Sequence, residues 1–109
     1  MKHPIPFETL ENIDVHVIKK DGTQELFIIT SGRLTSDEEV VSRLIDKITN
    51  YLNIIHYDDF IKEYGHPTKD KVFIIIKCSE TPESPIVDMV EKLKAHAEKN
   101  DASLSIDFG

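Results

Sequence analysis

Apolar residues occupy five consecutive positions from Val72 to Ile76, with Lys71 before them and Lys77 after them. A strand with apolar residues on both faces is typical of the interior of a sheet, where both faces are covered. Residues 72–76 are therefore predicted to form an inner strand, around which the core of the fold is built.

Three further strands are predicted from the alternation of apolar and polar positions. Residues 13–18 alternate, and the Asp21-Gly22 pair after them is typical of a tight hairpin turn, because glycine readily adopts positive φ angles. Residues 25–30 then return as the second strand. Residues 103–108 alternate strictly, which is typical of an edge strand with one solvated face. In the first strand, the alternation places on one face Ile13, Val15 and Val17.

Two amphipathic helices are predicted from apolar residues that recur every three or four positions. The first begins at Ser36, which forms a capping box with Glu39. The second begins at Ser84-Pro85 and ends at Asn100, a residue that tolerates the left-handed conformation. A shorter helix is predicted over 57–64. The apolar stripe of the first helix comprises Val41, Leu44, Ile45, Ile48, Leu52 and Ile55, and that of the second comprises Ile86, Met89, Val90, Leu93 and Ala97.

The predicted order, β-β-α-(α)-β-α-β, indicates the α+β class. It gives a two-layer sandwich in which a four-stranded mixed sheet carries both amphipathic helices on one face. Residues 13–109 are expected to form this single domain, and residues 1–12 an N-terminal arm. The second face of the sheet is expected to be unusually apolar, and the arm, the short helix or a partner chain is expected to cover it. The residues predicted there are Ile18, Phe27, Ile29, Phe73 and Ile75.

Charge and composition narrow the partner classes. The 109 residues include 20 Asp and Glu against 13 Lys and Arg, a formal charge of −7 that is spread evenly along the chain. Binding to nucleic acid depends on cations that neutralise phosphates, so no nucleic acid or anionic membrane partner is expected. No apolar run approaches the about 20 residues of a membrane span. The single Cys78 excludes an intramolecular disulfide, and a cytoplasmic location is expected.

Several polar clusters invite a chemical interpretation. His56, Asp58, Asp59 and His66 lie within eleven positions, but their spacing matches no paired-ligand zinc pattern, so neither a metal nor another cofactor is expected. The acidic run from Asp37 to Glu39 has a structural explanation, because negative charge stabilises the first turn of a helix. The chain has no nucleophile elbow, glycine-rich phosphate loop or calcium loop.

Aromatic residues supply the remaining candidates for a functional surface. Tyr57, Phe60 and Tyr64 fall on the short predicted helix, where they either tie this helix to the core or anchor a protein interface. Phe27 and Phe73 are the two aromatic candidates on the apolar second face of the sheet. All five are predicted interaction residues.

Four segments together resemble a family of small, mostly bacterial proteins known only as a domain of unknown function. These segments are Ile13-Asp14, Asp21-Gly22, the acidic run 37–39 and the helix segment 47–52, in which Lys47, Asn50, Tyr51 and Leu52 are similar to the family's pattern. The resemblance covers roughly residues 13 to 108. It implies a shared fold and no activity.

Three classes of function are compatible with these observations, the third of which is a purely structural or accessory role. The first is a non-enzymatic protein-binding module that pairs with a second copy of itself or with another protein. One example of such a module is an acidic immunity protein that neutralises a basic toxin. The second is a small metal- or ligand-binding enzyme that uses the segment with His56, Asp58, Asp59 and His66.

Overall fold

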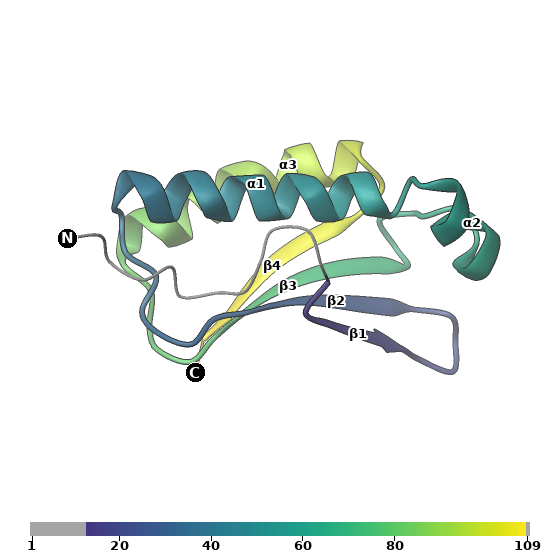
Figure 1. Cartoon of the computed structure of the whole chain (residues 1–109), viewed down its shortest axis with the longest axis horizontal. Coiled ribbons are helices and arrows are strands. Elements are labelled where there is room, and N and C mark those ends of the chain that lie inside the picture. Colours follow the sequence, from purple (N-terminus) through teal and green to yellow (C-terminus); the bar gives the residue numbers. More distant parts are fainter. Residues whose placement is uncertain (1–12, 109) are drawn as a thin grey trace.

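The strands form one sheet whose spatial order, β1-β2-β3-β4, follows the order of the chain (Figure 1). They are β1 (Val15–Ile18), β2 (Gln24–Ile29), β3 (Val72–Cys78) and β4 (Ser103–Phe108). β1 pairs with β2 antiparallel, whereas β2, β3 and β4 are parallel to one another. This computed structural model describes residues 13–108, so the predicted arm over 1–12 lies outside the described residues. The four-stranded mixed sheet and the inner position of β3 are confirmed.

The helices α1 (Glu38–Ile54) and α3 (Ser84–Lys99) connect the parallel strands, and both lie on the same side of the sheet (Figure 1). A short helix, α2 (Asp58–Tyr64), follows α1 and lies at one end of the molecule. The predicted two-layer α+β sandwich is confirmed. Because both crossovers run on one face, the sheet has no topological switch point, where ligand crevices usually form in α/β folds. None of the described helices is long and apolar enough to cross a membrane.

The core lies between the two layers. Alternate residues of β2 and β3 point toward the helices and are buried, and the helices bury one stripe each. The fully or nearly buried apolar residues include Leu26, Ile28, Val72, Ile74, Ile76 and Leu104 from the sheet and Val40, Leu44, Ile48, Leu52, Ile86, Val90 and Ala97 from the helices.

The predicted capping box of α1 is wrong. The helix begins at Glu38 after Asp37, and no side-chain cap is formed. The Ser36 hydroxyl instead donates to Glu83 Oε1 at 2.8 Å, and the Ser36 amide donates to the same oxygen at 2.9 Å. These bonds lower the pKa of Glu83 and fasten the loop before α1 to the loop before α3. A long-range carboxylate has thus replaced the local partner that the sequence pattern indicated.

The end of α3 also differs from the prediction. Asn100 is the C-cap but has a φ of −109°, whereas the next residue, Asp101, has the positive φ of 67°. The helix therefore turns one residue later than predicted. The hairpin prediction at Asp21-Gly22 is confirmed, because Gly22 has a φ of 89° and the Thr23 amide donates to Asp21 Oδ1 at 2.9 Å.

Candidate functional site

The sheet face opposite the helices is apolar across three strands. The register pairs Val15 with Phe27 and Phe27 with Ile75, so side chains of β1, β2 and β3 point to the same side. No element of the described chain lies on that side of the sheet (Figure 1). We call this surface the open sheet face, and its apolar residues are Val15, Val17, Phe27, Ile29, Phe73 and Ile75.

Several of these side chains are well exposed. The exposed fraction is 44% for Val15, 38% for Val17 and 37% for Ile29, while Phe27 and Phe73 are half-buried. A contiguous exposed apolar group commonly marks an interaction site. The open sheet face is therefore the main candidate functional surface.

The structure corrects which residues of β1 lie on the open sheet face. Ile18 is paired with Gln24 and so points to the helix side, whereas Val15 and Val17 point to the open side. The expected set therefore loses Ile18 and gains the two valines. Within β1, His16, rather than Val15 or Val17, is the residue that packs inward.

The fourth strand gives the open side a polar border. β4 contributes Ser105 and Asp107, and the Asp107 carboxylate accepts from Lys77 Nζ at 2.7 Å. Both members of this pair are more than half exposed, so the pair is solvated and adds little to stability. The apolar part of the face is thus confined to β1, β2 and β3.

A pocket lies where the open sheet face meets the β1–β2 hairpin. Its volume is about 370 Å³, and its lining comes from the hairpin, β3, β4 and the turn before β3. Phe73 and Ile75 supply apolar surface, and carboxylates come from Asp21, Glu25 and Asp70. Among the described residues of the lining, Lys19 supplies an ammonium, which lies 3.7 Å from Glu25 Oε2. We call it the hairpin-end pocket.

A buried ion pair fixes the chain that leads into β1. Lys47 Nζ of α1 donates to Asp14 Oδ1 at 2.8 Å, with 0% of the lysine side chain and 6% of the aspartate side chain exposed. Asp14 Oδ2 accepts from the amide of Ile29, the last residue of β2, at 2.9 Å. One carboxylate thus joins β2 to the helix layer, and this contact holds the start of β1 in place.

Tyr51 completes this buried network one helical turn further on. Its hydroxyl accepts from the Asp14 amide at 2.9 Å and donates to the Phe27 carbonyl at 2.7 Å. Burial raises the pKa of Tyr51 well above its ordinary value, so the hydroxyl stays protonated and can donate. Asp14, Lys47 and Tyr51 all belong to the segments that carried the resemblance to a family. Their shared position indicates that this part of the pattern is structural.

An aromatic cluster attaches α2 to the hairpin. The His16 ring stacks on Phe60 with centroids 5.8 Å apart and meets the edge of Tyr64 at 4.9 Å. Its Nε2 lies 2.8 Å from Gln24 Oε1. Because His16 points to the helix side, α2 does not cover the open sheet face, contrary to one of the three expectations for that cover. Phe60 is buried and Tyr64 half-buried, while Tyr57 is 55% exposed.

The histidine and carboxylate segment is not assembled as a metal site. His56 Nε2 lies 3.0 Å from the Asn100 carbonyl and 3.6 Å from Asp101 Oδ2, so its contacts are with the end of α3. Within residues 13–108, no three histidine, cysteine or acidic side chains are placed to hold a metal ion. Asp58 and Asp59 lie in the first turn of α2, where negative charge is favourable.

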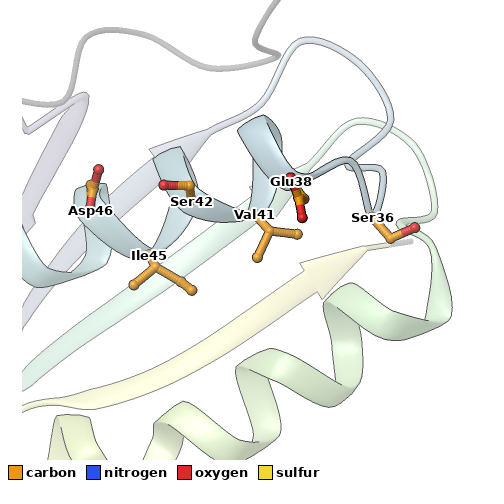
Figure 2. Close-up of a pocket in the computed structure, with 6 residues that line it drawn as sticks. All are labelled: Ser36, Glu38, Val41, Ser42, Ile45 and Asp46. Carbon is orange, nitrogen blue, oxygen red and sulfur yellow. The ribbon is translucent and has the colours of Figure 1, made fainter.

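A second groove of about 370 Å³ follows the first turns of α1. Figure 2 shows Val41 and Ile45 projecting from one side of this helix, while Asp46 and Ser42 point elsewhere. Its described lining comes from α1 and the loop before it. The hairpin-end pocket, lined by several elements, is the better enclosed candidate.

Sequence reasoning missed the Lys47–Asp14 pair and the hairpin-end pocket. A signal for the pair was present, because Lys47 lies three residues after Leu44 and four before Tyr51, on the buried side of α1. A lysine on an apolar stripe requires an acidic partner, but its partner is 33 positions away. No local signal marked the pocket, because its lining combines four separate segments.

These features define a class: a two-layer α+β domain whose sheet is covered by helices on one face and open on the other. A family model matches residues 6–108, and the chain belongs to that family, DUF6572, a family of unknown function. The resemblance to a family known only as a domain of unknown function is thereby confirmed. Comparisons with curated proteins and with solved structures gave no match.

Proposed function

We propose that this domain is a non-enzymatic protein-binding module, and that the open sheet face docks a different protein with a basic surface. The observation that carries the proposal is the group of six apolar residues on a face to which no described element packs. Exposed aliphatic and aromatic side chains supply the apolar centre that protein interfaces need.

Charge favours a different, basic partner over a second copy. The chain has a formal charge of −7, so two copies repel each other, whereas a cationic surface is attracted and its encounter is accelerated. The same chemistry fits an immunity-type protein that neutralises a basic toxin. A cytoplasmic location suits the reduced state of the single Cys78.

The test uses a photoreactive amino acid at Val17, with a matched control at Ile18. Both positions lie on β1 and are exposed, by 38% and 54%, but they point to opposite faces of the sheet. Cross-linking in cells of the source organism identifies the protein that contacts each position. The proposal expects one basic protein to be captured from position 17 and not from position 18.

Affinity measurements with the purified partner then test whether it binds to the open sheet face. Val17→Lys places a charge in the apolar centre of the interface, so we expect the dissociation constant to rise at least tenfold, with no such change for Ile18→Lys. Light scattering behind size exclusion at two protein concentrations measures self-association. A dimer that Val17→Lys disrupts would show that the open sheet face binds a second copy of the chain and not a basic partner. Equal effects of the two variants on the dissociation constant would refute the role of this face.

A further inference from the structure

We infer that the hairpin-end pocket receives an arginine side chain of the protein partner, which anchors that partner at one end of the open sheet face. This inference rests on the proposed function, because the pocket shares Phe73 and Ile75 with that face. It adds the chemical identity of the residue that the partner must present.

The charges of the lining favour a cation. Within the part of the lining that the structure describes, the carboxylates of Asp21, Glu25 and Asp70 stand against the ammonium of Lys19. The Thr23 amide and hydroxyl lower the pKa of Asp21, which keeps this carboxylate ionised at neutral pH. The Lys19 ammonium is half exposed and 3.7 Å from Glu25, so this pair is loose and solvated. An incoming cation would therefore meet an excess of negative charge.

The apolar part of the lining selects a cation with a flat, weakly hydrated head and an aliphatic stem. Phe73 is half-buried in the sheet and offers ring surface on which a guanidinium can stack. Ile75 and Phe73 can also contact the methylene stem. A guanidinium donates several hydrogen bonds in one plane to surrounding carboxylates, which an ammonium does not. A volume of about 370 Å³ accommodates one such side chain together with water.

Other occupants agree less well with these residues. The carboxylates are not grouped as ligands of a metal ion, since the described chain holds no such cluster. An anion would be repelled by the three carboxylates. A purely apolar side chain would displace water from these carboxylates and supply neither a charge nor a hydrogen bond in return.

The test is a selection of binders from a displayed library of random 12-residue peptides. Peptides that bind the wild-type protein but not the Val17→Lys variant are sequenced, and the best one is synthesised with each arginine in turn replaced by citrulline, which keeps the shape and removes the charge. We expect one arginine to be common to the selected peptides. Its replacement by citrulline is expected to weaken binding at least tenfold.

Asp70→Asn tests the pocket itself. Asp70 is exposed, so its replacement by the isosteric amide leaves the fold intact. The variant is expected to bind the arginine peptide several-fold more weakly than the wild type does, and to bind the citrulline peptide with unchanged affinity. Asp88→Asn, on the exposed side of α3, is the matched control for the loss of one negative charge.

The outcomes separate the inference from the proposed function. Peptides that depend on Val17 but share no arginine, or that bind equally well with citrulline, would overturn the inference and leave the open sheet face as a docking site. If Asp70→Asn and Asp88→Asn weaken peptide binding equally, the effect comes from net charge, and the assignment of the arginine to the hairpin-end pocket is also overturned. If no selected peptide depends on Val17, both proposals are rejected.

Discussion

Replacing Lys47 by methionine tests the buried ion pair most directly. Methionine keeps the approximate length and apolar stem of lysine but removes the ammonium, which leaves the Asp14 carboxylate, only 6% exposed, without its opposite charge. Breaking a buried pair by removing one partner costs about 3–5 kcal/mol. The expected free energy of unfolding for a domain of this size is about 5–15 kcal/mol, so the loss is a large part of the total.

A second substitution distinguishes an unpaired charge from lost packing. Asp14→Asn in the Lys47→Met background removes the stranded charge, while the amide oxygen can still accept from the Ile29 amide. The double variant is therefore expected to be more stable than Lys47→Met alone, which gives a clearly non-additive cycle. Lys62→Met, an exposed lysine on α2, is the control and should change stability by less than about 0.5 kcal/mol.

Urea unfolding followed by far-ultraviolet circular dichroism measures these free energies, since the chain has no tryptophan. Thermal unfolding should show the same order, with Lys47→Met about 12–20 °C below the wild type at roughly 4 °C per kcal/mol for a chain of about 100 residues. A loss below about 1 kcal/mol for Lys47→Met, or strictly additive losses in the double variant, would refute the assignment of a stabilising buried pair.

Two further buried groups give predictions of their own. Tyr51→Phe removes the partner of the Phe27 carbonyl and the Asp14 amide, so it should cost about 1–3 kcal/mol in urea unfolding at neutral pH. Because burial raises the pKa of Tyr51 above its ordinary 10.0, the folded wild type should lose stability as the pH rises above 10, and the variant should lose less; parallel losses would contradict this. Burial also raises the pKa of the Cys78 thiol, so this thiol should react with a disulfide reagent at pH 8 at less than a tenth of the rate measured in urea, and equal rates would show that it is accessible.

The candidate site was only partly predictable from the sequence. Phe27 and Phe73 were correctly placed on the open side, because each strand alternates and the opposite residues are strongly apolar. Ile18 was misplaced because β1 has apolar residues on both faces, so alternation by itself does not say which face is inward. The pairing of Ile18 with Gln24 and the packing of His16 against α2 decide the question. The hairpin-end pocket combines residues as distant as Asp21 and Ser105, which no local pattern relates.

The sequence by itself determined the elements, the class and the interior position of β3, because these depend on hydrophobic periods of two and 3.6 residues that are written into each segment. Only the tertiary structure decided which partner each polar group has. Ser36 donates to Glu83 rather than pairing with Glu39, and Lys47 donates to Asp14. A buried charge or an amide without a helical partner binds whichever group the fold brings near. The open sheet face has the same origin: both α1 and α3 cross on one side, and that arrangement leaves the apolar residues of the other side available for a partner.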